Sequence, residues 1–554
     1  MTHFTRTGQP LPASLTRQAP EMAADPVSRR EFLATACSFG ATAATAYAMM
    51  GLNAPAQAAA NAQMGGTVRI QQQLVAMRDP RKFDFNSLAT FTRGWLEYLV
   101  QYNSDGSFTP ILLDSWEISE DATEYSLNVR KGVTWNNGEP FTADDVANNI
   151  ARFCDGTVEG NAMAGKMQVM IDPETNQILP GVVEVTGSHT LKLKLPKPDI
   201  SLIASFADYP AAVVHPSFEE FSMLDNPIGT GPYLPEFYSV GDSAALVRNP
   251  DHTWWNAGNG GYMDRVEFID FGADPAAFFA GADADEYDVN YDTEGDYMDA
   301  YDSLDGWTKH EVTTAATVLA RCNQLAEVNG KAVYADARVR RALAMAVDNE
   351  VVLEIAYGGQ GRAAENHHVS PVHPDYADIG APVRDREVAM QLLEDAGMSD
   401  FEHELVSLDA AFWKATGDAI AAQLRDAGIK VKRTVFPTST FWNNWAKYPF
   451  SVTNWNHRPL GIQTLALAYR SGQGWNESGF ANAEFDALVE EALATADPEA
   501  RSKIMAKLEQ IMIDEGVIIQ PYWRSLYNHS KSNLKGAEIH ISNELYPQYM
   551  YWEA

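Results

Sequence analysis

The sequence predicts a mixed α/β protein with more than one hydrophobic core. The chain has 554 residues, of which 45% are hydrophobic, and a chain of this length buries its apolar side chains in two or three cores rather than one. Segments that alternate apolar and polar residues indicate strands, whereas apolar residues at helical spacing indicate helices. The two patterns are interleaved irregularly, which favours mixed sheets over a strict ladder of parallel strands and crossover helices.

Three segments carry the strand pattern. Residues 65–70 predict a first strand. Residues 125–130 place Tyr, Leu and Val on one face and Ser, Asn and Arg on the other, and Asn137-Gly138 is a turn signal shortly afterwards. Residues 190–195 alternate leucine with threonine and lysine, so we expect the lysines to face water.

The helix pattern begins most clearly at Thr142. This threonine can cap a helix whose first turn carries Asp144 and Asp145, because carboxylates are favourable near a helix N-terminus. Asp336 precedes a second candidate helix. The apolar stripes that predict four helices are Val146, Ile150 and Phe153; Val339, Leu343, Ala346 and Val347; Phe485, Leu488, Val489 and Leu493; and Ile504, Leu508 and Ile511.

The charge balance argues against one class of partner. There are 41 basic and 74 acidic residues, so the formal net charge is -33. An acidic surface repels phosphate backbones, and we therefore expect no nucleic-acid partner. The sequence has 3 cysteines, too few for a disulfide framework, and it leaves open whether Cys154 and Cys322 are bonded.

The N-terminal region has the features of an export leader. Arg29-Arg30 precedes a weakly apolar, alanine-rich run from residue 34 to residue 50, and Ala56-Gln57-Ala58 places small residues at a cleavage site. Together these features resemble a twin-arginine signal, so residues 1–58 are predicted to be a signal peptide and the mature protein to be periplasmic. The alternative is a membrane anchor, for which the run is short, because a bilayer span needs about 20 apolar residues.

An exported location limits the possible functions. No ATP pool exists outside the inner membrane, which disfavours kinases, synthetases and DNA-binding proteins. The sequence contains no Gly-x-Ser-x-Gly, His-Glu-x-x-His or Cys-x-x-Cys motif. We therefore predict that the chain is not an enzyme and carries no cofactor.

Seven separated motifs lie at residues 108–153, 226–233, 247–255, 338–348, 392–397, 423–429 and 480–486. Together they resemble the motifs of the family 5 extracellular solute-binding proteins, the peptide and nickel receptors of ABC importers. Each motif alone is weak, but they occur in the family's order along essentially the whole mature chain.

The resemblance implies a two-lobe periplasmic binding protein clamshell of type II-like topology, with mixed sheets and an extra inserted domain. Lobe I would comprise residues 59–105, 228–312 and 525–554, and residues 106–227 would be inserted into it. Lobe II would comprise residues 313–524. A small-molecule or oligopeptide ligand would lie between the lobes, and hinge crossings near residues 317–323 and 522–527 would let them close. The other implied partners are the permease and ATPase subunits of the importer, and the chain would act as a monomer.

The resemblance also proposes ligand-binding residues. Many peptide receptors of this family carry Trp-x-x-Asp where this chain has Trp455-Asn456-His457-Arg458. In those receptors the aspartate pairs with the ligand's ammonium group. A guanidinium attracts carboxylate or phosphate instead, so Arg458 predicts an electron-rich ligand group, unless it pairs with an acidic residue of the wall.

Four more residues complete the predicted site. Arg321 and Asn323 match the family's strand that runs from the hinge into the cleft, and the alternative for Arg321 is a hinge salt bridge. Trp442 and Trp475 could line the pocket or belong to the core. His367, His368 and His373 form a histidine cluster, but adjacent imidazoles in a loop diverge, so we predict no metal site.

The favoured function is a periplasmic substrate-binding component of an ABC importer, which captures a small peptide or a peptide-like, polar nitrogenous solute. Two alternatives remain. One is an exported hydrolase or cofactor enzyme on a similar scaffold, which turnover of the solute would reveal. The other is a sensor that presents its solute to a membrane receptor, which the sequence does not distinguish from transport.

Overall fold

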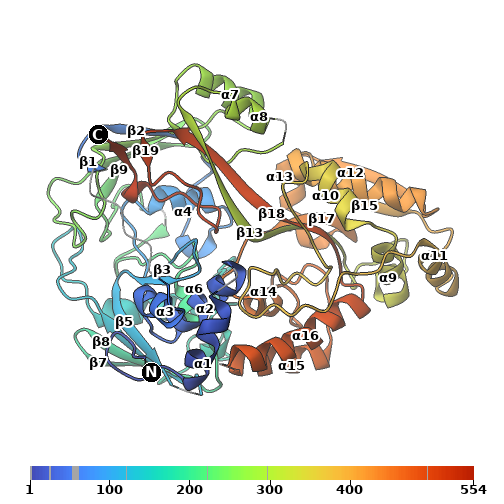
Figure 1. Cartoon of the computed structure of the whole chain (residues 1–554), viewed down its shortest axis with the longest axis horizontal. Helices are drawn as coiled ribbons and strands as arrows, with labels where there is room; N and C mark the ends of the chain where they lie inside the picture. The colour runs from blue at the N-terminus through green and yellow to red at the C-terminus, as the bar shows by residue number, and fades with distance from the viewer. Residues whose placement is uncertain are drawn as a thin grey trace. The chain divides into compact units, whose positions relative to one another are not determined.

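A computed structural model describes residues 3–23, 26–52, 62–119, 121–220, 223–295, 297–495 and 497–554 (Figure 1). The chain divides into two compact units. Unit 1 comprises Met1–Val312 and Leu526–Ala554, and unit 2 comprises Thr313–Ser525. The chain passes between them twice, inside β13 (Trp307–Cys322) and inside β18 (Ile518–Lys531). That these units are lobes that close around a ligand stays a prediction.

The main sheet of unit 1 has the strand order β18-β12-β2-β11-β10-β9. Its centre is parallel, because β2 (Thr67–Gln71) pairs in parallel with both β12 (Val289–Asn290) and β11 (Arg265–Ile269). The outer strands β10 (Ser243–Arg248) and β9 (Tyr233–Ser239) continue it in antiparallel pairing. Val68 and Ile70 of β2, which share one face of the strand, are fully buried. This confirms the predicted first strand.

A second sheet of unit 1 confirms the two other predicted strands. Its order is β5 (Leu113–Ile118), β6 (Glu124–Val129), β8 (Thr190–Lys194) and β7 (Val183–Gly187), with antiparallel pairing throughout. In β8, Leu191 and Leu193 are buried while Lys192 and Lys194 are exposed. The solvent side of this sheet is therefore the lysine side, as the alternation predicts.

Helix α5 (Ala143–Phe153) packs against β7 and β8 and begins where the sequence predicts. The carboxylate of Asp145 accepts a hydrogen bond from the Thr142 backbone N–H at 2.7 Å, which closes the first turn. Val146, Ile150 and Phe153 are all buried, so the predicted stripe is the face that this helix turns to the protein.

Shorter elements complete unit 1. They are α4 (Asn86–Thr92), α6 (Leu202–Phe206), α7 (Pro275–Asp283) and α8 (Tyr297–Asp302), the antiparallel pair β3 (Val100–Tyr102) and β4 (Phe108–Pro110), and a small sheet of β1 (Ala62–Gln63), β20 (Tyr551–Glu553) and β19 (Leu534–Lys535). Short 3-10 turns lie at Pro80–Lys82, Gln168–Met170 and Pro547–Tyr549.

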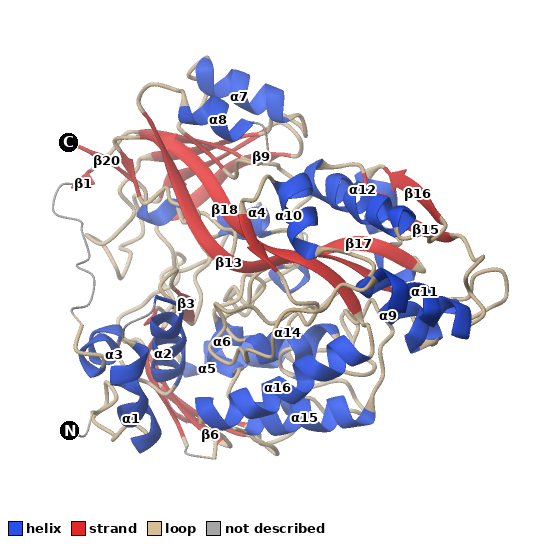
Figure 2. Cartoon of the chain, turned by 45° about the vertical axis from the view of Figure 1, so that its right-hand side comes forward, coloured by secondary structure: helices blue, strands red, loops and turns tan. Residues whose placement is uncertain are grey.

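The N-terminal region also forms helices, which the sequence pattern does not predict. These are α1 (Ala13–Met22), α2 (Pro26–Ser38) and α3 (Ala43–Met49) (Figure 2). Helix α2 packs against β4. Within the described part of the chain, none of the helices is both long enough and apolar enough to span a membrane. The proposed cleavage site at Ala56-Gln57-Ala58 lies outside the described residues.

Unit 2 is built on a sheet of order β16-β15-β17-β13-β18. Strand β15 (His403–Leu408) pairs in parallel with β16 (Val431–Phe436) and with β17 (Phe450–Trp455), and β17 pairs antiparallel with β13. Helix α12 (Ala411–Asp426) packs on β15, β16 and β17. Buried side chains of this helix, including Ile420 and Leu424, meet Leu405 and Val452 in the core of the unit.

The remaining elements of unit 2 include α10 (Asn349–Tyr357), β14 (Gly361–Ala363), α11 (Arg386–Asp395), α13 (Thr438–Trp442), α14 (Gly461–Ala468) and a 3-10 turn at Trp445–Lys447. Helix α9 (Ala337–Met345) starts where predicted, because Asp336 accepts a hydrogen bond from the Arg338 N–H at 2.9 Å. It ends earlier than the predicted stripe, so Ala346 and Val347 are buried beyond its last residue.

Helices α15 (Ala483–Ala494) and α16 (Pro498–Asp514) lie side by side (Figure 1). Both carry the predicted stripes: Phe485, Leu488 and Val489 are buried in α15, and Ile504 and Leu508 in α16. Leu493 and Ile511, the last residues of each stripe, are half-buried.

The three cysteines, Cys37, Cys154 and Cys322, are free and buried. The bond between Cys154 and Cys322 that the sequence leaves open is therefore not formed.

Candidate functional site

The predicted ligand residues gather at the end of β17 in unit 2. Trp455 is the last residue of this strand and lies opposite Thr317 of β13. The chain then leaves the sheet through residues 456–460, in which Pro459 prevents further ladder pairing, and α14 begins at Gly461. We call residues 455–460 the site loop.

Trp455 is the centre of an aromatic cluster. Its ring meets the ring of Trp475 at 5.8 Å and the ring of His368 at 5.6 Å, both edge to face. His368 in turn shares a 2.7 Å hydrogen bond between its Nδ1 and the hydroxyl of Tyr469. Burial lowers the pKa of His368 well below its usual value, so this imidazole is neutral at pH 7. Trp455 is only 6% exposed, whereas Trp475 is half-buried.

A carboxylate that the sequence did not single out, Glu477, fixes the orientation of Trp455. Its Oε1 accepts hydrogen bonds from the indole Nε1–H of Trp455 at 2.9 Å and from the hydroxyl of Thr453 at 2.8 Å. Its Oε2 lies 3.1 Å from Nε of Arg321. Glu477 is one acid among 74 Asp and Glu residues, and no local pattern distinguishes it before the chain is folded.

The Arg321 guanidinium is occupied within unit 2. Besides the ion pair with Glu477, it donates to the carbonyl of Tyr448 at 2.8 Å and to the carbonyl of Trp445. Its side chain has no exposed surface. The arrangement matches the salt-bridge alternative for this residue, and it makes Arg321 the support of Trp455 and of the segment at residues 445–448.

His457 and Arg458 are polar residues of the site loop, and both are buried. His457 accepts a hydrogen bond at Nδ1 from the Ala315 N–H at 3.1 Å, so its proton in the neutral ring is on Nε2. Arg458 is 4% exposed, and its Nη1 donates to the His457 carbonyl at 3.0 Å and, at 3.5 Å, to the carbonyl of Asn456. Asn456 is half-buried. These bonds hold the guanidinium against its own loop.

Asp375 anchors the other end of the site loop. Its two oxygens accept hydrogen bonds from the N–H groups of Gly461 at 2.7 Å and Ile462 at 2.8 Å, and its side chain has no exposed surface. It thus satisfies the free donors at the start of α14. A side chain at Gly461 has no room, because its Cβ would lie 2.6 Å from Val369. The sequence offers one signal for Asp375, its place in the histidine-rich segment.

The three clustered histidines bond different partners. His367 Nε2 lies 2.9 Å from a Glu365 oxygen, whereas His373 Nδ1 accepts from the Ser370 N–H at 2.9 Å. The Nδ1 atom of His367 faces Glu509 at 3.9 Å, and burial raises the pKa of Glu509 well above its usual value. No group of His, Cys, Asp and Glu in the described residues is arranged to hold a metal ion.

Asn323 and Trp442 lie in a neighbouring part of unit 2. The Asn323 amide donates to the Ala446 carbonyl at 3.1 Å and accepts from the Leu325 N–H at 3.0 Å. Trp442 is half-buried in α13 and contacts the rings of Phe441 and Trp445 at 5.3 and 6.4 Å. The fold thus brings Trp455, Trp475 and the site loop together, and it connects Arg321 and Asn323 through the segment at residues 445–448.

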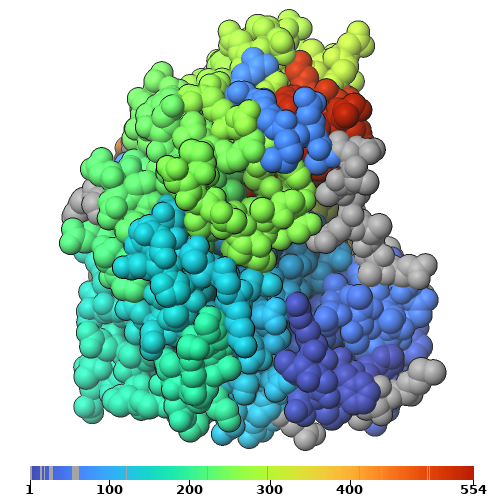
Figure 3. Space-filling view, turned by 90° about the vertical axis from the view of Figure 1, so that its left-hand side faces the viewer, coloured from blue at the N-terminus to red at the C-terminus, as the bar shows by residue number. Residues whose placement is uncertain are grey.

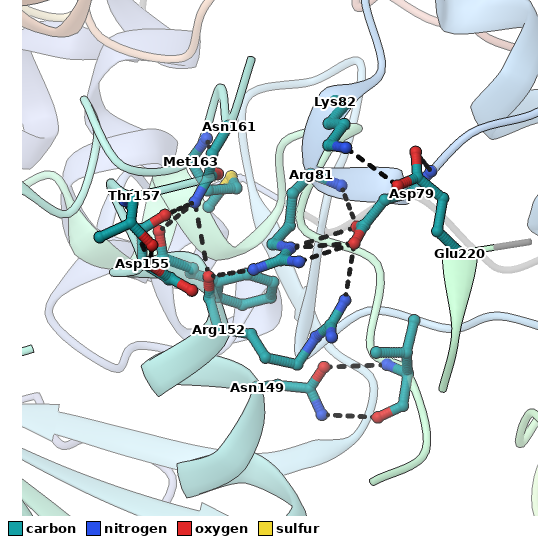
Figure 4. A network of polar contacts seen from close by, with 12 residues as sticks. Asp79, Arg81, Lys82, Asn149, Arg152, Asp155, Thr157, Asn161, Met163 and Glu220 are labelled. Atoms are coloured by element: carbon teal, nitrogen blue, oxygen red, sulfur yellow. Dashed lines mark hydrogen bonds and ion pairs between the residues drawn. The ribbon is translucent and has the colours of Figure 1, made fainter. Parts of the chain in front are cut away.

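Unit 1 contains a charged network of its own, in the loop that follows β2 (Figure 4). Asp79 lies between the guanidinium groups of Arg81, at 2.7 Å, and Arg152, at 3.0 Å. Burial alone would raise the pKa of Asp79, but hydrogen bonds from Arg81 and the charge of Arg152 hold it below its usual value. Lys82 pairs with Glu220 at 2.9 Å beside them. The network tethers this loop to α5, which carries Arg152.

The comparison with known proteins decides the family. Residues 107–477 match the model of the bacterial extracellular solute-binding proteins, family 5 Middle. The chain is a member of this family. The predicted resemblance is thereby confirmed, and the family is one of binding proteins rather than enzymes.

Relatives and solved structures agree with this assignment. The dipeptide-binding protein DppE of Bacillus subtilis strain 168 is 24% identical over 473 residues, which cover 80% of this chain and 84% of DppE. The Escherichia coli murein tripeptide binding protein MppA has a TM-score of 0.77 at 21% identity, over 89% of this chain and 99% of that chain. The binding protein AgaA from A. tumefaciens R10, in complex with agropinic acid, has a TM-score of 0.76 at 20% identity, over 88% and 99%. The chain therefore has the fold of this family, as predicted.

Proposed function

We propose that this chain is the exported solute-binding component of an ABC importer, and that it captures a small peptide or peptide-like solute. Membership of family 5 carries the proposal. Two of the three similar proteins named above are a dipeptide-binding protein and a murein tripeptide binding protein. Export through the twin-arginine route, delivery to a permease with its ATPase subunits and action as a monomer belong to the same proposal. The work of such a receptor is differential affinity of two conformations for the ligand.

The polarity of the site loop indicates which ligand group it receives. The resemblance places Arg458 where many family members carry an ammonium-binding aspartate, and the neutral ring of the neighbouring His457 carries its proton on Nε2. A guanidinium and an N–H donor bind a carboxylate or another electron-rich oxygen. AgaA is a family neighbour whose ligand is agropinic acid, which is consistent with an acidic solute in this fold.

The aromatic cluster supplies the apolar part of the proposed site. Trp455 and Trp475 meet edge to face, and Glu477 with Arg321 prevents the Trp455 indole from turning. Fixed aromatic faces beside a few polar groups are typical of small-molecule sites. Asn456, Asn323 and Trp442 stay in the proposal as further ligand-binding residues.

Mass spectrometry of the solute that co-purifies with the native chain tests the function. The expected result is a small solute released unchanged. A solute that is consumed on incubation would instead favour the exported enzyme. In parallel, the melting temperature is measured with a dipeptide, its N-acetyl derivative and its C-terminal amide. If Arg458 receives a carboxylate, acetylation is tolerated and amidation removes the stabilisation; the opposite ranking would contradict the ligand polarity proposed here.

The variant Arg458→Ala tests the residue itself. Loss of one charge-assisted bond costs about 1.5–3 kcal/mol, which weakens binding about 10- to 150-fold. Arg458→Lys recovers part of the affinity, because lysine lacks the planar fork, and Arg458→Asp shifts preference towards free amino termini. Arg338→Ala, on the exposed side of α9, is the control. Binding by Arg458→Ala within about twofold of the native chain would remove Arg458 from the site and leave the receptor assignment intact.

A further inference from the structure

The N-terminal helices belong to unit 1 and bury apolar side chains against the rest of it. Leu33, Ala36 and Cys37 of α2 have no exposed surface, and Phe32 and Phe39 are 2% and 5% exposed. Figure 3 shows the dark-blue and blue atoms of this N-terminal segment seated directly against the cyan atoms of the following region of unit 1. The weakly apolar run of the N-terminal segment thus packs with its apolar side chains buried.

Specific polar bonds accompany this burial. The Trp116 indole Nε1–H donates to the Ser38 carbonyl at 2.9 Å, and the Tyr47 hydroxyl donates to an Asp105 oxygen at 3.0 Å. At the margin, Arg6 pairs with Asp114 at 3.1 Å. Directional bonds at separate points fix one orientation of the helices on unit 1, which unspecific apolar contact does not do.

Two glycines allow the close approach. A Cβ at Gly106, in the turn between β3 and β4, would lie 2.6 Å from the Arg30 carbonyl oxygen, and a Cβ at Gly40 would lie 2.5 Å from the Trp116 carbonyl oxygen. These distances are too short for any side chain. The surface of unit 1 is therefore shaped to receive this segment, and we call it the leader-docking surface: Tyr102, Asp105, Gly106, Phe108, Asp114 and Trp116.

Docking changes the environment of the arginine pair. Arg29 and Arg30 lie in the first turns of α2, and both are half-buried. The Arg29 Nη2 donates to the Ala23 carbonyl at 3.1 Å, and the aliphatic part of Arg30 covers Gly106. A signal that is read through its two arginines must present them to a receptor, and in the docked state they are engaged within the chain.

We infer that unit 1 carries a docking site for the chain's own N-terminal helices, and that this contact withholds the arginine pair until the helices detach. The inference rests on the proposed export leader for its biological meaning, but the docking itself is a property of the folded chain. The occupant of the leader-docking surface is the segment at residues 26–49 of the same molecule. Its release exposes both the arginines and the apolar side chains of Phe108 and Trp116.

Cys37 provides a native reporter of docking. Burial raises the pKa of its thiol to about 12, so it is a poor nucleophile while the helices are docked. Cys154 and Cys322 are equally buried in the two units and serve as internal references. The full-length precursor is treated with a maleimide under native conditions, and the labelled cysteines are identified by peptide mass spectrometry. The expected result is that Cys37 reacts no faster than the two references.

Matched glycine variants test the surface. Gly106→Ala and Gly138→Ala both place a side chain on a turn glycine of unit 1 with φ near +90°, at +92° and +89°, but only Gly106 faces the N-terminal helices. Gly106→Ala is expected to accelerate Cys37 labelling at least about tenfold, an effect of order 1.4 kcal/mol, with Cys154 and Cys322 unchanged. Gly138→Ala is expected to leave all three rates unchanged.

A second pair lies in the N-terminal segment itself, so these variants leave the leader-docking surface unaltered. Gly40→Ala is expected to release Cys37 in the same way, whereas Gly8→Ala, with φ +91° and no neighbour within 4 Å, is not. If Gly106→Ala unfolds unit 1, Cys154 also becomes reactive. The comparison of Gly40→Ala with Gly8→Ala then tests the docking. Rapid labelling of Cys37 in the unmodified precursor, or equal rates in both members of the Gly40 pair, would overturn the docking.

Limited trypsin digestion reads the arginines directly. Cleavage after Arg29 and Arg30, followed by site-resolved mass spectrometry, is expected to be at least about tenfold faster in Gly40→Ala than in Gly8→Ala, which is again a change of order 1.4 kcal/mol. Equal cleavage rates would show that docking does not cover the pair. Export of Arg29→Lys/Arg30→Lys is measured separately: normal export of this double variant would refute the twin-arginine route while leaving the Cys37 result to decide the docking.

Discussion

Replacing Glu477 by glutamine removes a buried charge that three side chains depend on. The carboxylate pairs with Arg321, whose side chain is fully buried, and accepts hydrogen bonds from Thr453 and Trp455. Glutamine keeps the size and one acceptor oxygen, so the hydrogen bonds from Thr453 and Trp455 can persist. The Arg321 charge, however, loses its counter-ion in the interior of unit 2. Breaking a buried pair by removing one partner costs about 3–5 kcal/mol, because the remaining charge is uncompensated.

Differential scanning calorimetry measures this cost. For a unit of about 200 residues, 1 kcal/mol shifts the melting temperature by about 2–4 °C, so Glu477→Gln is expected to lower the unit 2 transition by roughly 6–20 °C. Thr453→Val is the matched control. It removes one hydrogen bond to the Glu477 carboxylate but leaves the charge pair with Arg321 in place. A hydrogen bond to a charged group is worth about 1.5–3 kcal/mol, so this variant should lower the transition by about 3–12 °C.

The double variant Arg321→Met/Glu477→Gln separates charge from packing. It removes the uncompensated charge, so it is expected to be more stable than Glu477→Gln alone, as buried ion pairs replaced by neutral side chains often are. The reasoning would be refuted by a Glu477→Gln transition no lower than that of Thr453→Val, or by a double variant that is less stable than Glu477→Gln.

Two further predictions concern unit 2. Asp375→Asn leaves one acceptor oxygen where two backbone N–H groups now bind separate oxygens, so hydrogen exchange at residues 456–463 should become faster and ligand binding should weaken. The control Asp385→Asn should have neither effect, because a single oxygen of Asp385 accepts both of its hydrogen bonds. Equal effects of the two variants would contradict this reasoning. Burial lowers the pKa of His403 to about 4 from an ordinary 6.5, so between these values the unfolded chain binds a proton that the folded chain does not, and stability is complete above pH 6.5 and falls towards pH 4. His403→Gln should reduce the difference between the free energies of unfolding at pH 7 and pH 4.5 by about 3 kcal/mol, at 1.36 kcal/mol per pH unit. Urea unfolding at the two pH values measures this difference, and an unchanged difference in the variant would refute the prediction.

The sequence by itself determined the local elements and the family. The alternation in β6 and β8 and the stripes of α5, α15 and α16 are written in neighbouring residues, because strand and helix periods act over two to four positions. The starts at Thr142 and Asp336 follow from caps that bond within three residues. The family motifs are likewise contiguous, and the matching region, residues 107–477, includes every residue of the predicted site.

Only the tertiary structure decided what the charged residues of that site do. Arg321 meets Glu477 across 156 positions, and Asp375 reaches the start of α14 from 86 positions away; neither pairing has a local signature. The leader region also could not be predicted from local sequence. Its alanine-rich run indicates only an export signal, and its packing depends on the surface that Trp116 and Gly106 provide. The physical reason is that the sheets bring segments together that are far apart in the sequence. These distant segments supply the partner of a buried charge or of a weakly apolar helix, and a local sequence pattern does not show which segments will meet.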